Sequence, residues 1–164
     1  MVHMKVMNHL THKRQEKEYS CGAASFGMLF GMDEPIARRL VKCNKSGTAT
    51  GKVCEALKGM GVDYHMVHIN EDFRLYKDFL KYNSIRWPLY LSCVYRHRYY
   101  VKGRDYVRHH AIAIADGMIY DPSENQAEPV ECYEHAFNKS LHINGIIIID
   151  QERPDFRKNF VDFL

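Results

Sequence analysis

The sequence predicts an α+β fold in which a helical N-terminal part packs on an antiparallel β-sheet. Two observations favour this class: apolar residues recur at helical spacing in the first half, and short β-prone runs fill the second half. Composition agrees, because 46% hydrophobic and 26% charged residues among 164 are typical of a globular protein and exclude a disordered or collagenous one. We expect a single domain over residues 1–164, with a core of about 15–150 and a tail at 151–164.

Helices are expected throughout the first half. The first runs from Cys21 to about Phe30, because Ser20 can cap its first turn and small residues, Gly27 among them, suit burial against close neighbours. Apolar stripes and terminal signals predict three more helices, which start at Asp33, cover about Thr50–Met60 and cover Glu71–Lys81.

Strands are expected in the second half. The run Pro88–Tyr95 is short and β-prone, and Asn144–Asp150 is a second buried strand after a helix near Val130–Lys139. Between them, His110–Tyr120 forms two alternating arms around Asp116-Gly117, a dipeptide that type I′ hairpin turns prefer. These strands make the sheet antiparallel.

Charge is concentrated in one segment. The net charge of the chain is only +3, too small to indicate binding of nucleic acid over the whole surface. The segment 95–108, however, interleaves four tyrosines with five basic residues and one aspartate. Such a segment can stack bases and pair phosphates, or it can form a rim for an acidic substrate, and its plainest interpretation is a solvated strand connection.

The compartment and the cofactors follow from cysteine and histidine usage. Five cysteines, far apart in sequence and without a Cys-x-x-Cys pair, do not form a disulfide framework or a zinc motif. No signal-peptide core and no membrane-spanning run is present, so we expect a cytoplasmic protein with no membrane partner. His9 with His12 and His65 with His68 lack a third ligand nearby, so we expect neither metal nor cofactor.

Three residues bring reactive chemistry together. Cys21 lies at a helix start, where the helix dipole favours a thiolate. With a two-residue turn at 116–117, the numbers of residues paired across the hairpin sum to 233. His110 and Asp121 are then diagonal neighbours whose side chains share one face of the sheet, and His109 points to the opposite face. A thiol, a histidine and a carboxylate so placed are the parts of a Cys–His–Asp site.

The motifs resemble a known family. Gln15-x5-Cys21-Gly-Ala-Ala, His110-Ala-Ile-Ala-Ile and Asp121-Pro, with Gly47-Thr48 between them, are similar to papain-like cysteine peptidases, and most of all to the bacteriocin-processing group that removes double-glycine leaders. The resemblance implies a papain-like fold, with Cys21 as nucleophile, His110 as general base and acid, and Asp121 as its orienting group. It also implies that Gln15 donates to the oxyanion beside the Cys21 N–H.

The expected function is a cysteine peptidase that acts on peptide or isopeptide bonds of a polypeptide, with an acidic stretch as one option for its substrate. Within the same chemistry, deamidation of glutamine or acyl transfer stays open, because each begins with the same thioester. The alternative from another class is a non-catalytic papain-like module that uses residues 95–108 to bind nucleic acid or an acidic protein.

Overall fold

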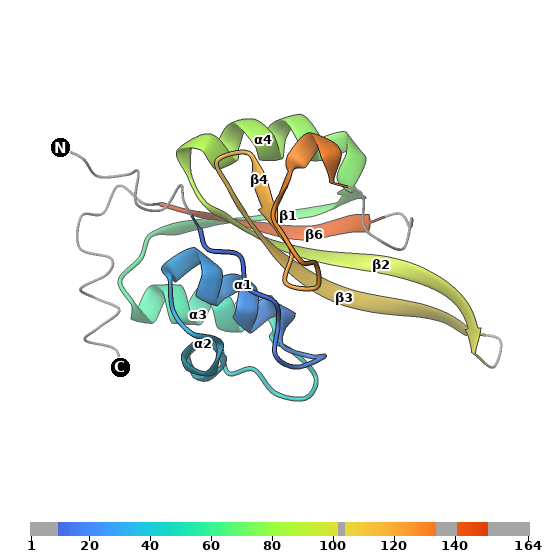
Figure 1. Cartoon of the computed structure of the whole chain (residues 1–164), viewed down its shortest axis with the longest axis horizontal. Coiled ribbons are helices and arrows are strands. Elements are labelled where there is room, and N and C mark those ends of the chain that lie inside the picture. The colour runs from blue at the N-terminus through green and yellow to red at the C-terminus, as the bar shows by residue number, and fades with distance from the viewer. Residues whose placement is uncertain (1–9, 102–103, 134–140, 151–164) are drawn as a thin grey trace.

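The computed structural model describes residues 10–101, 104–133 and 141–150, with the backbone alone given for 95–101 and 104–108. Three helices come first, followed by strands interrupted by a fourth helix and two short 3-10 helices (Figure 1). The helical elements are α1 (Cys21–Phe30), α2 (Glu34–Leu40), α3 (Thr50–Gly59), η1 (Phe73–Tyr76), α4 (Lys77–Arg86) and η2 (Val130–Cys132). The strands are β1 (Tyr64–Asp72), β2 (Leu89–Val101), β3 (Arg104–Ala115), β4 (Met118–Tyr120), β5 (Glu128–Pro129) and β6 (Leu141–Ile149).

The six strands form one antiparallel sheet in the order β1-β6-β2-β3-β4-β5. Helices α1–α3 lie against one face and α4 lies against the other, as Figure 1 shows. Alternation along the strands supplies both cores: Tyr90 and Ala113 pack with α1–α3, whereas Leu91 and Ile112 pack with Leu80 of α4. The predicted α+β layout of helices on an antiparallel sheet is confirmed.

The hairpin register agrees with the prediction. Ala113 pairs with Tyr120 and Ala115 pairs with Met118, so each pair of residue numbers sums to 233. Asp116 and Gly117 have φ values of 50° and 74°, the positive values that a type I′ turn requires at both central positions. The Asp-Gly dipeptide therefore fixes which residues of β3 and β4 share a face.

Helix α1 is thin because it packs closely on its neighbours. A Cβ atom at Gly27 would lie 2.8 Å from the carbonyl oxygen of Met32 and 3.5 Å from the Cβ of Ala37 in the middle of α2. All residues from Gly22 to Phe30 are buried. The small residues are therefore required by this close approach, as the sequence indicated.

Several elements differ from their predictions. Strand β1 was not foreseen, and the helix expected from Glu71 starts only after it, as η1 and then α4. The strand predicted at Pro88–Tyr95 continues to Val101 and pairs with β3, which starts at Arg104, so the described part of the basic segment lies in two paired strands.

Several predicted elements fall partly or wholly on residues that the structure does not describe. The helix expected near Val130–Lys139 is the three-residue η2, and residues 134–140 lie outside the described part, as do the tail at 151–164 and the side chains of 95–108. No helix in the described ranges combines the length and hydropathy needed to cross a bilayer.

Candidate active site

Helix α1 delivers its first residue to an open edge of the sheet. Strand β4 is only three residues long, so the main-chain groups of Ala111, which would be next in the β3–β4 ladder, have no strand partner on that side. Helix α1 satisfies them: the Ser25 hydroxyl donates to the Ala111 oxygen at 3.0 Å, and the Ala111 N–H donates to the Cys21 thiol. The early end of β4 thus makes room for the thiol.

Ser20 does not cap α1 in the way that its position predicts. Its hydroxyl makes no bond to the first helical turn and instead accepts from the Lys17 N–H at 3.0 Å and donates toward the Glu34 carboxylate at 3.1 Å. Glu34 also accepts the N–H of Glu16 at 2.9 Å, and burial raises the pKa of its carboxyl. The first N–H groups of α1 therefore stay uncapped by side chains, and the Gly22 N–H donates to the Cys21 sulfur.

His110 and Asp121 meet as the register predicts. His110 Nε2 lies 2.6 Å from Asp121 Oδ1, and the exposed fractions are only 6% for His110 and 1% for Asp121. His109 is exposed, so the two adjacent histidines point to opposite faces. Because Nε2 donates to the carboxylate, Nδ1 is the ring nitrogen left for the hydrogen bond to Cys21.

Four donors hold the Asp121 carboxylate. Oδ1 accepts from His110 and from both the N–H and the hydroxyl of Ser123, at 2.9 and 2.7 Å, and Oδ2 accepts from the Tyr133 hydroxyl at 2.7 Å. The backbone of the same turn is tied to the N-terminal segment, because His12 Nε2 donates to the Asp121 carbonyl at 2.8 Å. A carboxylate so bonded has one orientation and stays charged, since burial raises its pKa but the bonds from His110 and Tyr133 lower it further, below its usual range.

The electrostatics favour an ion pair between Cys21 and His110. Burial alone would raise the pKa of Cys21, but hydrogen bonding and charge from His110, with the N–H groups of Ala111 and Gly22, lower it below its usual value. Burial would likewise lower the pKa of His110, but its bonds to Asp121 and Cys21 raise it to about 9. Both shifts favour a thiolate beside an imidazolium over a neutral thiol beside a neutral imidazole.

Gly22 leaves no room for a side chain next to the thiol. A Cβ atom there would lie 2.8 Å from the Tyr90 hydroxyl and 2.9 Å from the Cβ of Thr48. The Thr48 hydroxyl is buried without a hydrogen-bond partner among the described residues. Thr48, of the Gly47-Thr48 pair that the sequence singled out, therefore packs directly against the residue that follows Cys21.

Gln15 is anchored in the loop before α1. Its N–H donates to the Pro122 oxygen at 2.9 Å, which joins the loop to the turn that carries Asp121. Its side-chain Nε2 donates to the carbonyl oxygens of Lys17 and Glu18 at 2.8 and 3.1 Å, and its Oε1 is buried without a hydrogen-bond partner in the described structure. Both amide protons are thus used within the loop.

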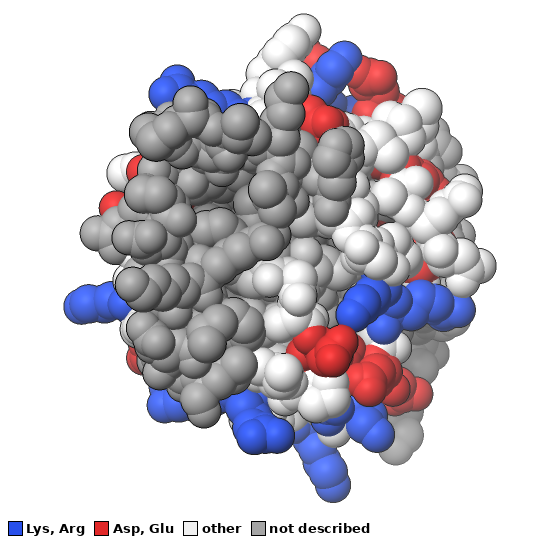
Figure 2. Space-filling model, turned by 60° about the vertical axis from the view of Figure 1, so that its left-hand side comes forward, with Lys and Arg blue, Asp and Glu red and all other residues white. Residues whose placement is uncertain are grey.

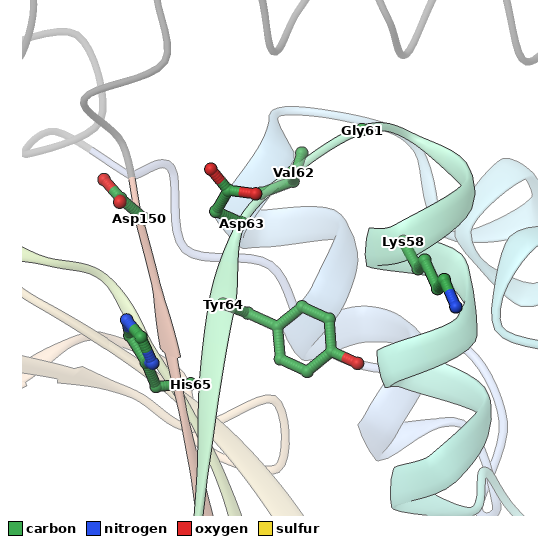
Figure 3. Close-up of a pocket in the computed structure, with 7 residues that line it drawn as sticks. All are labelled: Lys58, Gly61, Val62, Asp63, Tyr64, His65 and Asp150. Atoms are coloured by element: carbon green, nitrogen blue, oxygen red, sulfur yellow. The ribbon is translucent and has the colours of Figure 1, made fainter.

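The histidines considered for metal binding lie elsewhere. His65 lines a hollow at the start of β1 together with Asp63 and Asp150, whose carboxylates lie in the upper left of Figure 3. The Tyr64 side chain points to the other side of the strand, toward α3. Within residues 10–101, 104–133 and 141–150, no three His, Cys, Asp or Glu side chains are grouped to hold a metal ion. His9 lies outside the described residues.

Sequence reasoning missed the groups that hold Asp121. Ser123 is the last residue of the sequence Asp-Pro-Ser, and an aspartate side chain commonly accepts a hydrogen bond from the N–H two residues later. The local sequence therefore contained a signal for the contact between Ser123 and Asp121. Tyr133 reaches the carboxylate from η2, and His12 reaches the same turn from the N-terminal loop. No short-range pattern marks either contact, because each joins segments far apart in the chain.

Comparisons with known proteins add a fold-level relationship. No known family matches the sequence, and no curated protein matches it either. Among solved structures, one similar chain is a double glycine motif protease from an AMS/PCAT transporter in complex with its leader peptide, at 15% identity and a TM-score of 0.54, covering 87% of this chain and 92% of that one. Another is the peptidase domain of Streptococcus ComA, a bifunctional ABC transporter of a quorum-sensing pathway, at 18% identity and a TM-score of 0.53, covering 88% and 100%.

Both similar structures are peptidase domains of transporters, and the first is described as a double glycine motif protease, the group that the sequence motifs resemble. At such low identities the similarity establishes the architecture and not the activity. The chain thus has the fold of papain-like peptidase domains, with helices packed on a six-stranded antiparallel sheet.

Proposed function

We propose that the protein is a cysteine peptidase that hydrolyses peptide or isopeptide bonds of a polypeptide substrate. The observation that carries the proposal is the continuous set of hydrogen bonds from the Cys21 thiol through His110 to the buried Asp121 carboxylate. The fold supports it, because the two similar solved structures are peptidase domains and one of them holds a leader peptide.

In the proposed reaction, the Cys21 thiolate attacks the carbonyl carbon and a C–S bond forms while the carbonyl oxygen takes the negative charge. The His110 imidazolium then donates its Nδ1 proton to the leaving nitrogen, the C–N bond breaks, and a thioester remains on Cys21. Neutral His110 next takes a proton from water, whose oxygen attacks the thioester carbon. The C–S bond then breaks, which releases the carboxylic acid and returns the Cys21 thiolate beside the His110 imidazolium. Asp121 keeps the ring oriented and stabilises the imidazolium throughout.

The oxyanion requires donors near the start of α1. The N–H of Cys21 precedes the first helical hydrogen bond, which runs from the Ala24 N–H to the Ser20 oxygen, so α1 itself does not use it. We assign the second donor to Gln15 Nε2. To donate to the oxyanion, this nitrogen must give up one of its two hydrogen bonds to the carbonyl oxygens of Lys17 and Glu18. Loss of one such donor slows turnover by about 10²–10³-fold.

The test is alkylation by limiting iodoacetamide from pH 5 to pH 9, mapped by peptide mass spectrometry. We expect Cys21 to react well below the thiol pKa of about 8.5, and to lose this reactivity in His110→Ala and His110→Gln. Equal reactivity of all five cysteines, or no response to His110, would refute the proposal. Salt-sensitive binding of nucleic acid without thiol reactivity would instead support the non-catalytic module.

Product analysis separates the reactions that share the thioester. New termini in a cleaved polypeptide identify hydrolysis of the chain, ammonia release without cleavage identifies deamidation, and a new amide on an added amine identifies acyl transfer. A bell-shaped dependence of rate on pH is expected in all three cases, because Cys21 and His110 titrate as a coupled pair.

A further inference from the structure

A groove lined by basic residues opens beside the loop that leads to Cys21. It has a volume of about 680 Å³ and lies between Tyr19, the end of α2 and the turn at 43–45. Four of its lining residues are cationic and none is acidic; they are Arg38, Arg39, Lys42 and Lys45. In Figure 2, Lys and Arg side chains gather along the lower edge of the molecule, at the height of α2 in Figure 1.

Three of these cations have no charged partner among the described residues. Arg38 is held by Glu34 and Glu16, at 3.4 and 3.7 Å, and serves to fix the loop. Arg39, Lys42 and Lys45 are exposed, and none of them forms an ion pair with another described residue. The groove therefore presents three positive charges that no described side chain neutralises.

The backbone at Lys42 points to a role for its side chain. Lys42 has a φ of 50° in the left-handed region, directly after α2. The Cys43 N–H bonds to the Arg38 oxygen at 2.9 Å and the Lys42 N–H bonds to the Arg39 oxygen at 3.3 Å, the pattern of a helix end at which glycine is preferred. A lysine at this position carries backbone strain that glycine would remove.

The groove adjoins the nucleophile. Tyr19 lines it, and Tyr19 and Cys21 are two residues apart, so their Cα atoms are at most about 7 Å from each other. The turn that follows Lys45 continues to the site, since a Cβ atom at Gly47 would lie 3.6 Å from the Tyr19 oxygen and one at Gly22 would lie 2.9 Å from the Cβ of Thr48. A chain bound in the groove can thus pass directly to the thiol.

We propose that this groove binds an acidic segment of the polypeptide substrate and leads the adjoining bond to Cys21. The inference rests on the proposed peptidase function and names the charge of its substrate. A polypeptide is favoured over nucleic acid for two reasons. The groove shares a loop with a site built to attack a carbonyl carbon, and Tyr19 is the only described aromatic side chain that lines the groove and could stack on a base.

The test compares two electrophilic peptides on the full chain. Chloroacetylated hexaglutamate and chloroacetylated (Gly-Ser)₃ both alkylate Cys21 with loss of chloride, and the ratio of their rate constants isolates recognition from thiol reactivity. We expect a ratio of about tenfold at low salt that falls as salt rises. It should fall close to one in the groove variant Arg39→Gln/Lys42→Gln/Lys45→Gln.

The control variant removes three charges elsewhere. Lys52→Gln/Lys58→Gln/Lys77→Gln also lowers the net charge from +3 to 0, since 3 − 3 = 0, and it should keep the ratio of the unmodified chain. Lys42→Gly supplies a second control: we expect its melting temperature to rise while its ratio falls, which a purely structural lysine would not produce.

A ratio near one in the unmodified chain, or equal loss in both triple variants, would overturn the proposal. So would binding of an oligothymidylate that the groove variant alone loses, if hexaglutamate gives no rate advantage. Slow labelling of Cys21 by the neutral peptide would count against the peptidase function. The absolute rate of this labelling therefore tests the proposed function, whereas the ratio of the two rate constants tests the groove.

Discussion

The change Asp121→Asn tests whether the carboxylate charge sets the ionisation of His110. Asparagine keeps an oxygen where His110 and Ser123 donate, and it places an amide nitrogen toward Tyr133, whose hydroxyl can turn to accept. The geometry is therefore retained and the charge is lost.

The magnitude follows from the pKa of His110. It is raised from 6.5 to about 9, and at 1.36 kcal/mol per unit this corresponds to about 3 kcal/mol in favour of the imidazolium. Burial opposes this shift, and Asp121 and Cys21 produce it together. We expect Asp121→Asn to lower the pKa of His110 by about one to two units, because a neighbouring opposite charge is worth that much.

The assay is an NMR titration of isotope-labelled histidine, with the His110 resonance assigned by its loss in His110→Gln. Asp78→Asn, a change of an exposed aspartate on α4, is the matched control and should leave the titration unchanged. A midpoint near 6.5 in the unmodified chain, or one that Asp121→Asn does not move, would refute the reasoning.

The same shift links stability to pH. Because the folded pKa of His110 lies above its unfolded value of 6.5, its contribution to stability is fully present below pH 6.5 and is lost as pH rises through about 9. Asp121 acts in the opposite sense, since its pKa is lowered: its contribution is present above the ordinary value of 3.8 and is lost as pH falls below it. Urea unfolding across pH should show both losses, and Asp121→Asn should weaken both.

Three further changes test packing near the site. Gly22→Ala should destabilise the fold by about 1–3 kcal/mol in urea, because its Cβ would lie 2.8 Å from a buried tyrosine hydroxyl, whereas Gly51→Ala meets nothing within 4 Å and should be neutral or stabilising; equal effects would contradict this. Tyr133→Phe removes a donor from the buried Asp121 carboxylate, and we expect a loss of about 1–3 kcal/mol in urea, so an unchanged midpoint would count against that bond. Lys42→Gly should stabilise the chain by about 0.5–1 kcal/mol by relieving its positive φ, and a lower melting temperature would show that the lysine is structurally required.

The placement of His110 beside Asp121 could be predicted because it depends on local rules. Asp116-Gly117 selects a type I′ turn, and the turn fixes the register of β3 and β4. Because side chains alternate between the two faces of a strand, this register places His110 and Asp121 on the same face. The helix start at Cys21 was also predicted locally, from Ser20 as its capping residue, and it is confirmed although the Ser20 hydroxyl bonds elsewhere.

What could not be predicted depends on contacts between distant segments. Strand β1 is half-exposed and carries His65, His68 and Glu71, so its sequence lacks clean alternation, and it is a strand because β6 pairs with it. Likewise, the Ser20 hydroxyl leaves its cap position because Glu34 offers it a buried carboxylate from α2. The hydrogen bonds that occupy the Gln15 amide follow from the path of its loop, for which the sequence carries no signal.

The sheet order has a consequence for synthesis of the chain. Strand β6 lies between β1 and β2, so residues 64–72 have no partner strand in the described sheet until residues 141–149 have been made. A ribosome releases the chain from its N-terminus, so Cys21 emerges long before His110, Tyr133 or β6. Until then the cysteine is an ordinary thiol on an incomplete chain. Under the proposed function, the Cys21 thiol is activated only after nearly the whole sheet has been synthesised. A chain truncated before β3 would therefore lack peptidase activity.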